Sequence, residues 1–514
     1  MVARKTGSAM SEDRSGSWCK SACLAALGAV TCGVFLVPFC QSSPQDGPPV
    51  QASSMAATSV ESSFGLLSPD LLSNFTAEHN SSLLWGTYRP GVYFGLRSRT
   101  IPTALVAGLM WTSARPDGTA EQSTLRHQCE QDSIQKYGFS QHDGRGYGHQ
   151  LILDPENGIA LNTSFLRAPF LHSGGSGSKF ATGGWAVRIT GKPTMQRAKD
   201  QHVYFYVAID SEFADHDMMT GSLHIVPAAN SHPAQEFLVT GTAASLGDFS
   251  ILMEARETLE ESSGAGAASL PIHVWGSAIR KHSHLNVDEI VMEQTSGTRH
   301  ANAGVDKDHQ NLGRLNGIVD EGSHLLVLQV RSGDRPFEID ITYLPAKGND
   351  DLEGQGTEIC SDLSKEHCKK SIIAQHRQWH GVPLGEEIVQ RADAFRSRLI
   401  NTFGLKCRVD KADDELAKAR CQSPLLNGRP LGSKEIDFAA AALGAQLGSL
   451  GFFYGQTILA QSDADKAPER TALAPLLSIV PSRPFFPRGF LWDEGFHVLL
   501  VGAWDEDLAG EAVV

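Results

Sequence analysis

The 514-residue sequence is short of positive charge. It has 44 Lys and Arg residues against 58 Asp and Glu residues, which gives a formal net charge of -14. No basic patch stands out that could neutralise phosphates, so nucleic acid is excluded as a partner. An uncharged sugar substrate is compatible with this balance. The 41% of hydrophobic residues are enough for the cores of two or three domains.

Cysteine is scarce as well, and none of its spacings is typical of a metal site. Four of the nine cysteines lie in or beside residues 21–40, and five lie beyond that segment. Because five is odd, at least one of the later thiols is free or pairs outside the chain. Two pairs are near enough in sequence to close short loops, Cys360 with Cys368 and Cys407 with Cys421. We therefore predict structural cysteines, and neither a metal ion nor another cofactor.

Charged side chains are absent from residues 21–40. A helix of this length roughly spans a hydrocarbon core of about 30 Å. Basic residues outnumber acidic ones in residues 1–20, so the positive-inside rule predicts a cytosolic tail there and a lumenal position for the rest. This predicts a single-pass type II signal-anchor. A cleaved signal peptide is the alternative, because glycine and proline make the segment only moderately apolar.

Residues 41–69 are rich in Ser, Pro and Ala and have few large apolar side chains, which predicts a flexible stem. Three glycosylation sequons follow, at Asn74, Asn80 and Asn162. Such sequons also arise by chance, but these fit a lumenal position of the folded part.

Residues 70–345 are predicted to fold as an antiparallel β-sandwich. Short apolar runs are punctuated there by Gly, Asn and Asp, and convincing long helices are few. The clearest runs are 186–189, 203–208, 325–330 and 337–343. Residues 346–384, which begin with a polar stretch, are predicted to be a linker or insertion.

From about residue 385 the apolar residues recur every three or four positions, which is typical of amphipathic helices. One helix is predicted over 388–403 and a second over 436–450, with Ser433 as a plausible cap for the second. The second helix leads into residues 448–456, where glycines permit close packing or a break and aromatic residues cluster. Residues 385–514 are therefore predicted to form a helical domain.

Residues 484–497 concentrate aromatic side chains, an arginine and two adjacent carboxylates. Prolines at 484 and 487 fix φ and oppose a helix before them, which predicts an ordered loop. Apolar residues at helical spacing follow and place Asp493 and Glu494 at the N-terminus of a helix. An acid at that position is usually a cap for free backbone N–H groups. An aromatic loop that presents an acid is also a common way to hold a sugar ring.

The string from Pro484 to His497 closely resembles the signature of glycoside hydrolase family 63, which contains processing α-glucosidases of the endoplasmic reticulum. The string from Trp85 to Gly95 looks like part of the family's N-terminal domain. This resemblance implies a β-sandwich followed by an (α/α)6 barrel, with the active site at the barrel mouth. It also implies an inverting enzyme that removes the terminal α-1,2-linked glucose from the triglucosylated N-glycan precursor. The expected partners are N-linked glycans of nascent glycoproteins and, through residues 21–40, the endoplasmic reticulum membrane.

The resemblance carries the role of catalytic general acid onto Asp493. Around this acid, the predicted sugar contacts are Arg488, Phe490, Trp492 and Glu494. A general acid must keep its proton near neutral pH, so its pKa must be raised. The apolar wall of the loop would raise the pKa of Asp493, whereas Arg488 and the helix N-terminus would lower it. In an inverting glycosidase the second carboxyl group lies about 6.5–9.5 Å away and activates a water.

Tyr454 and Gln456 are further candidates for the sugar site, because the helix before them resembles the family's first inner-barrel helix. The family's general base lies near the far end of the barrel, and no glutamate of this chain matches it by motif. We therefore expect a C-terminally truncated member in which only the start of the barrel is present. The alternative function is that of an inactive fragment or a membrane-tethered glycan-binding β-sandwich.

Overall fold

The computed structural model describes most of the chain beyond residue 78. The described residues are 79–101, 103–114, 124–130, 136–167, 183–194, 200–210, 221–226, 236–258, 268–277, 287–302, 315, 322–345, 366–405, 431–459 and 468–513. All of them belong to one compact unit, Leu67–Ser423 with Pro430–Val514. The predicted tail, anchor and stem at 1–20, 21–40 and 41–69 lie outside the described residues, and so does Asn74. Among the helices that are described, none is both long and apolar enough to cross a membrane.

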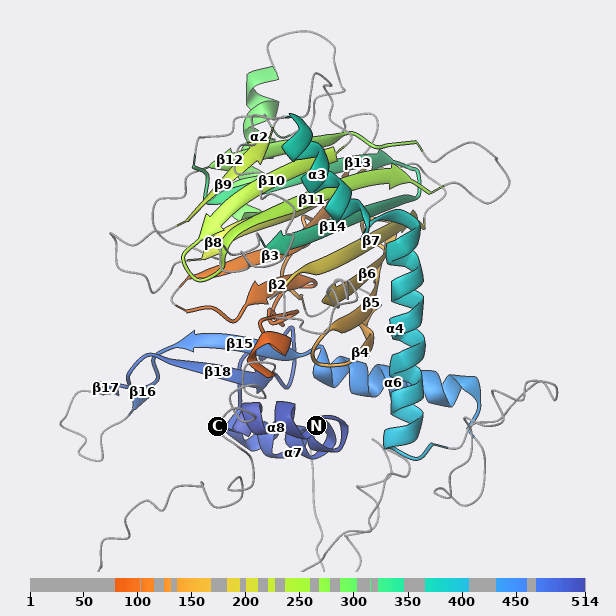
Figure 1. Cartoon of the computed structure of the whole chain (residues 1–514), viewed down its shortest axis with the longest axis vertical. Helices are drawn as coiled ribbons and strands as arrows, with labels where there is room; N and C mark the ends of the chain where they lie inside the picture. Colours follow the sequence, from red (N-terminus) through yellow and green to blue (C-terminus); the bar gives the residue numbers. More distant parts are fainter. Residues whose placement is uncertain are drawn as a thin grey trace, which may run out of the picture. The chain divides into compact units, whose positions relative to one another are not determined.

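Two antiparallel sheets enclose the main hydrophobic core, which confirms the predicted sandwich (Figure 1). The six-stranded sheet has the order β1 (Trp85–Gly86), β2 (Gly95–Ser98), β3 (Ala104–Ala114), β8 (Asp200–Asp210), β13 (Leu325–Gly333), β12 (Ile272–Ser277). The eight-stranded sheet has the order β4 (Lys136–His142), β5 (Tyr147–Asp154), β6 (Ile159–Arg167), β7 (Trp185–Pro193), β14 (Phe337–Pro345), β11 (Gly247–Glu257), β10 (Glu236–Ala243), β9 (Gly221–Val226). The four apolar runs named above correspond to β7, β8, β13 and β14.

Side chains alternate between two sides along the central strands of the six-stranded sheet. Leu105 and Phe205 belong to the core between the sheets. Met110 and Tyr206 belong to a second cluster on the outer face, together with Val287 of α2 (Val287–Asn302). Because both faces are covered, β3 and β8 are buried along almost their whole length. Each fully buried apolar side chain contributes roughly 1.5–3 kcal/mol relative to an exposed one.

Helix α3 (Glu366–Arg377) lies across β11 and β14 on the outer face of the eight-stranded sheet (Figure 1). It falls within residues 346–384, which the sequence suggests as a linker. Buried His376 holds the helix to the sheet, since its two ring nitrogens hydrogen-bond the hydroxyls of Ser250 and Thr342 at 2.9 and 2.6 Å. A short turn then leads into α4 (Gly381–Thr402), which confirms the predicted helix at 388–403 and begins earlier.

Helix α6 (Ser433–Leu447) confirms the second predicted helix, but its cap differs from the prediction. The N-cap residue is Gly432, not Ser433, which is already helical. The N–H of Gly432 donates to the carboxylate of Glu435 at 2.6 Å, which is the bond that the glutamate makes in a capping box.

The backbone leaves the helical conformation after α6 and forms a two-stranded ribbon. Strand β15 (Leu450–Gly455) pairs with β18 (Ala474–Ile479), and β16 (Ile458–Leu459) pairs with β17 (Glu469–Arg470). The predicted break within 448–456 is therefore confirmed, and the helix ends at Leu447, short of the predicted residue 450. Consecutive aromatic residues favour the extended backbone here.

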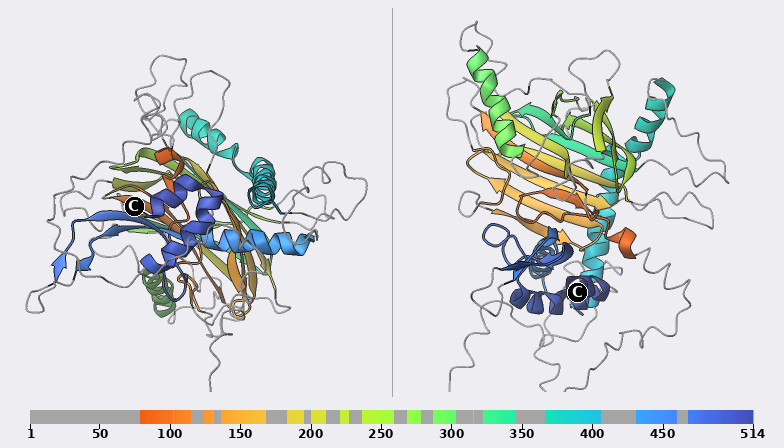
Figure 2. Two further views of the ribbon diagram at one scale, coloured as in Figure 1. Left: turned by 90° about the horizontal axis from the view of Figure 1, so that it is seen from below. Right: turned by 90° about the vertical axis from the view of Figure 1, so that its left-hand side faces the viewer.

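Helix α6 packs against β4, the edge strand of the eight-stranded sheet, through two glycines. A Cβ on Gly444 would lie 2.9 Å from the Cα of Gln141, and a Cβ on Gly448 would lie 2.2 Å from a ring carbon of Phe139. Only glycine permits this close approach of a helix backbone to a strand. Helices α7 (Leu491–Trp504) and α8 (Glu506–Val513) lie at the same end of the sandwich as α6 (Figure 2).

Candidate functional site

Asp493 lies in the first turn of α7, as the sequence predicts. The N-cap residue Phe490 has an extended backbone, with φ -134° and ψ 116°, and makes no side-chain capping hydrogen bond. Asp493 and Glu494 are the acidic residues of this first turn, where the helix dipole favours negative charge. The side chain of Asp493 is half-buried, so it keeps access to solvent.

Glu494 points into the protein and ties α7 to strand β18. Its carboxylate accepts a hydrogen bond from the Ser478 hydroxyl at 3.0 Å and one from the Ile479 N–H at 3.1 Å, and only 6% of the residue is exposed. His497 lies one turn along the helix, with Nδ1 3.5 Å from the same carboxylate. These contacts fix the rotation of α7 about its axis and thereby the direction of Asp493. The sugar contact predicted for Glu494 stays a prediction.

Aromatic side chains with large exposed fractions surround the start of α7. Phe485 is 53% exposed, Phe486 50% and Trp492 77%. The ring of Phe490 meets that of Phe486 edge-on at 5.6 Å, and the guanidinium of Arg488 lies 4.8 Å from the centre of the Phe490 ring. The loop thus presents flat apolar faces and one cation beside the half-buried acid, which are the groups expected to contact a sugar.

Tyr454 and Gln456 lie on the ribbon rather than on a helix. Tyr454 is a half-buried residue of β15, and Gln456 follows the strand and is exposed. The partner strand β18 carries Ser478, which binds Glu494. Both candidates therefore lie on the two-stranded unit that supports α7. Their role as sugar contacts is untested.

Arg483, which the sequence reasoning missed, fastens the loop to the sandwich. Its buried guanidinium donates to the carbonyls of Val92 and Tyr93 at 2.8 and 2.7 Å and to the side-chain oxygen of Gln150 at 2.7 Å. Its Nε donates to the carbonyl of Pro90 at 3.2 Å. Neutral oxygens thus accept four hydrogen bonds from it, an arrangement that the planar guanidinium suits and an ammonium does not.

The two strings that resemble the family lie against each other in the structure. Besides the bonds of Arg483 to residues 90–93, a Cβ on Gly91 would lie 3.3 Å from the Cβ of Pro487. The N–H of Phe452 donates to the carbonyl of Tyr88 at 3.2 Å. The N-terminal string thus forms a platform under the ribbon and the aromatic loop. Arg483 directly precedes the loop in the sequence, and this proximity was the only signal that could have suggested its role.

Ion pairs and a neutral hydrogen bond hold α7 and α8 to the N-terminal part of the described chain. Arg145 donates two hydrogen bonds to the carboxylate of Asp505, at 2.5 and 2.8 Å. Burial alone would raise the pKa of Asp505, but the bonds from Arg145 outweigh it and the pKa is lowered. Arg99 donates to Glu511 at 2.8 Å, and the Trp504 indole N–H donates to a backbone carbonyl of residue 143 at 2.9 Å.

The cysteines of the described part behave as structural residues. Cys368 is disulfide-bonded, and Cys129 is a free, buried thiol whose pKa is raised by burial. A buried thiol with a raised pKa is a poor nucleophile. Within the described ranges, no group of three or more His, Cys, Asp or Glu side chains could hold a metal ion.

Comparisons with known proteins identify the class of protein. The model of the glycosyl hydrolase family 63 N-terminal domain matches residues 82–314, and the model of that family's C-terminal domain matches residues 386–514. The chain belongs to glycosyl hydrolase family 63.

Several curated glucosidases are similar to this chain in sequence. The chain is 30% identical over 446 residues to a mannosyl-oligosaccharide glucosidase of Arabidopsis thaliana, which covers 84% of this chain and 42% of the relative. It is 29% identical to an alpha-glucosidase 2 of the same plant, over 86% of this chain and 47% of the relative. It is 24% identical to a mannosyl-oligosaccharide glucosidase of Saccharomyces cerevisiae, over 84% of this chain and 48% of the relative. The chain thus spans somewhat less than half the length of these relatives.

Among solved structures, a bacterial glucoamylase complexed with acarbose is similar over 58% of this chain and 38% of its own. With 8% identity and a TM-score of 0.27, this likeness carries no argument about the site.

Proposed function

We propose that this protein acts as a mannosyl-oligosaccharide glucosidase in N-glycan processing. The reaction is hydrolysis of the terminal α-1,2-linked glucose of the triglucosylated N-glycan precursor, with inversion at the anomeric carbon. Membership of the family and the names of the relatives support the substrate class. The observation that carries the proposal is the half-buried Asp493 in the first turn of α7, beside exposed aromatic faces and fixed in direction by the bonds of Glu494.

In this proposal, Asp493 protonates the glycosidic oxygen as the bond to the leaving sugar breaks. Phe490 and Trp492 offer ring faces to the C–H surfaces of the sugar, and Arg488 donates hydrogen bonds to its hydroxyls. Glu494 contributes by orienting the helix, because its oxygens already accept bonds from Ser478 and Ile479. The glycan is neutral, which agrees with a site that contains one exposed cation and few fixed charges.

Inversion also requires a carboxylate that activates water on the opposite face of the sugar, about 6.5–9.5 Å from the acid. No motif in the chain assigns this base, and the proposal names none. The remainder of the (α/α)6 barrel is likewise a proposal from family membership, in which the helices from α4 onward form its beginning.

We further propose that the folded part lies in the lumen of the endoplasmic reticulum, behind an anchor at residues 21–40. A disulfide at Cys368 fits an oxidising compartment. The sequon residues Asn80 and Asn162 are both exposed, as attachment of a glycan requires.

The test is release of glucose from a triglucosylated high-mannose oligosaccharide by the protein purified from its own cells through a tag on the genomic copy. Release of a single β-configured glucose per glycan, followed by NMR, would support both the substrate and inversion. Binding of the oligosaccharide without release would instead favour the glycan-binding alternative. Release of the α-anomer would refute the inverting mechanism.

A further inference from the structure

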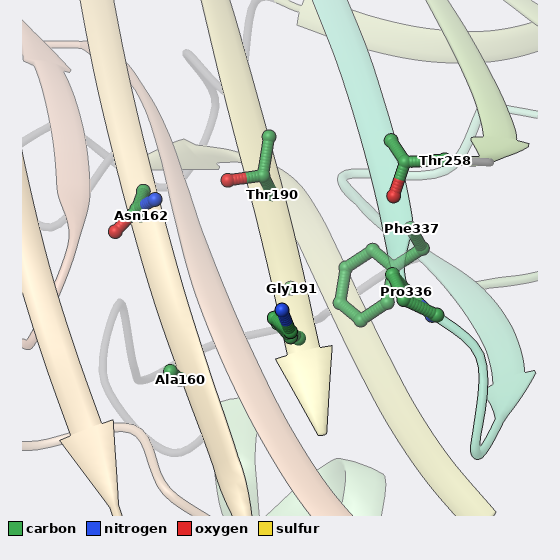
Figure 3. Close-up of a pocket in the computed structure, with 8 residues that line it drawn as sticks. Ala160, Asn162, Thr190, Gly191, Thr258, Pro336 and Phe337 are labelled. Atoms are coloured by element: carbon green, nitrogen blue, oxygen red, sulfur yellow. The ribbon is translucent and has the colours of Figure 1, made fainter. Parts of the chain in front are cut away.

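The eight-stranded sheet carries a cavity far in sequence from the proposed site. It has a volume of about 390 Å³ and opens between β6, β7 and β14 (Figure 3). The lining residues are Ala160, Asn162, Thr190, Gly191, Lys192, Thr258, Pro336 and Phe337. Hydroxyl, amide and ammonium groups thus lie beside the aliphatic carbon of Ala160 and Pro336.

The cavity lies on the outer face of the sheet. Asn162 and Lys192 are exposed there, whereas Phe337 is 0% exposed and belongs to the core between the two sheets. A Cβ on Gly191 would lie 2.1 Å from a ring carbon of Phe337, the residue paired with it across β7 and β14, so position 191 faces the same core. The phenyl ring therefore fills space on the inner side of the sheet (Figure 3), and the cavity is bounded on its outer side by the neighbouring strands.

Asn162 lies at the rim of the cavity, and it is also the acceptor residue of a glycosylation sequon. Along β6 the side chains alternate, so that Leu161 and Thr163 are fully buried while Asn162 is exposed. Its paired neighbours on the outer face are Leu151, which is 37% exposed, and Thr190. A central strand is an unusual place for a sequon, because a bulky glycan is tolerated there only where the asparagine points outward and space lies beside it. Both conditions hold.

We propose that Asn162 carries an N-linked glycan whose first N-acetylglucosamine occupies this cavity. The sugar has an N-acetyl methyl group and C–H faces that match Ala160 and Pro336, and hydroxyls that match Thr190, Thr258 and Lys192. Its attachment to the rim gives it a high local concentration, so weak contacts suffice to hold it. The bound sugar covers apolar carbon of the sheet surface and thereby stabilises the fold.

The inference rests on the lumenal placement proposed above, and Asn80 provides the matched control. Asn80 is an exposed sequon residue that does not line the cavity. Mass spectrometry of tryptic peptides from the protein purified from its own cells should find one glycan on Asn162. An unmodified Asn162 beside a modified Asn80 would overturn this inference alone, whereas absence of glycans at both would also overturn the lumenal placement.

Occupancy of the cavity is tested by deglycosylation of the folded protein with a peptide-N-glycosidase. The glycan on Asn162 should be released several-fold more slowly than that on Asn80, since the enzyme must reach the bond to the first sugar. Ala160→Phe fills the cavity but leaves the sequon intact, and it should bring the two release rates together. Equal rates in the unmodified sequence would overturn the proposal.

Stability provides a second readout, which does not depend on glucose release. Asn162→Gln should lower the thermal midpoint by about 2–4 °C, while Asn80→Gln should leave it unchanged. If Asn162→Gln does not yield folded protein, the release rates measured on the natural sequence still decide the question. Equal thermal midpoints for both variants would contradict a stabilising, bound sugar.

Discussion

At the scale of single residues, the candidate site depends on side chains whose polar atoms are already engaged by the protein. Hydrogen bonds of Glu494 and Arg483 to other parts of the protein determine where Asp493 and the aromatic loop lie. Arg483 is buried and donates to four oxygen atoms of the protein, so its removal breaks four buried hydrogen bonds. The position of Asp493 and of the aromatic loop thus depends on residues that adjoin them in the sequence.

Arg483→Met should destabilise the protein by roughly 2–4 kcal/mol, because the carbonyls of Pro90, Val92 and Tyr93 each lose a hydrogen bond inside the protein. Urea denaturation followed by fluorescence measures this loss. The matched change at the exposed Arg488, Arg488→Met, should alter stability by less than about 0.5 kcal/mol. Equal stability of the two variants would contradict the anchoring role of Arg483.

Asp493→Asn should lower glucose release by at least about 10²-fold, since an amide cannot donate the proton that a general acid supplies. Its fold and its glycan affinity should be unchanged. Asp507→Asn, a change at an exposed acid of α8, serves as the control and should keep full activity. Normal turnover in Asp493→Asn would remove this residue from the acid role.

The position of Asp493 at a helix N-terminus could be predicted from sequence, because prolines, aromatics and helical spacing are local signals. The role of Arg483 could not. Its acceptors at residues 90–93 come from a part of the chain about 390 positions earlier, and nothing local states which carbonyls it will meet. Likewise, nothing local to Glu494 indicates that its carboxylate accepts a hydrogen bond from Ser478.

At the scale of secondary-structure elements, the packing of α6 against β4 connects the C-terminal helices to the sandwich. The contact is close because Gly444 lies against the backbone of Gln141. Strands β7, β8, β13 and β14 and helices α4, α6 and α7 were predictable, since alternating and helical apolar periods are properties of short segments. Residues 450–455 were harder, because an uncharged aromatic run suits a buried helix end and a paired strand equally, and only the partner at 474–479 decides.

Gly444→Ala should destabilise the protein by about 1–3 kcal/mol, although alanine is the better helix former, because the new methyl group forces α6 away from β4. Gly510→Ala in α8 is the control. A Cβ at position 510 would meet no atom of the described residues within 4 Å beyond its own helix backbone, so the change should be neutral or stabilising by about 0.5–1 kcal/mol. Thermal denaturation of both variants distinguishes the two effects. Stabilisation by Gly444→Ala would refute the close packing.

At the scale of the whole molecule, buried histidines make stability depend on pH. The Nδ1 atom of His142 accepts the N–H of Gly144 at 3.0 Å, which requires a neutral ring. Burial lowers the pKa of His142 to about 4 and that of His376 to about 3. Burial would raise the pKa of Glu254, but bonds from His380 and Arg377 lower it to about 2.

Stability should therefore fall as the pH decreases from about 6.5 to 4. In this window His142 and His376 bind protons in the unfolded chain but stay neutral in the folded protein. Below pH 4.5 Glu254 also binds a proton in the unfolded chain while it stays ionised in the folded protein, which adds to the loss of stability. The expected loss per buried histidine is roughly 1–3 kcal/mol. Urea midpoints measured between pH 7.5 and 4.5 check this, and His142→Gln should reduce their slope. A midpoint independent of pH would contradict neutral buried histidines.

The bond between Arg99 and Glu511 joins residues that are 412 positions apart. A ribosome adds about 5–20 residues per second, so about 20–80 s separate the synthesis of the two partners. The last strand of the sandwich ends at Pro345 and α6 begins at Ser433, so for about 4–18 s of this interval all strands of the sandwich have been synthesised while the surface of β4 that receives α6 is still uncovered. Phe139 and the neighbouring backbone then face water until α6 arrives. The growing chain thus presents a temporary binding surface for chaperones, which disappears when the last helices dock.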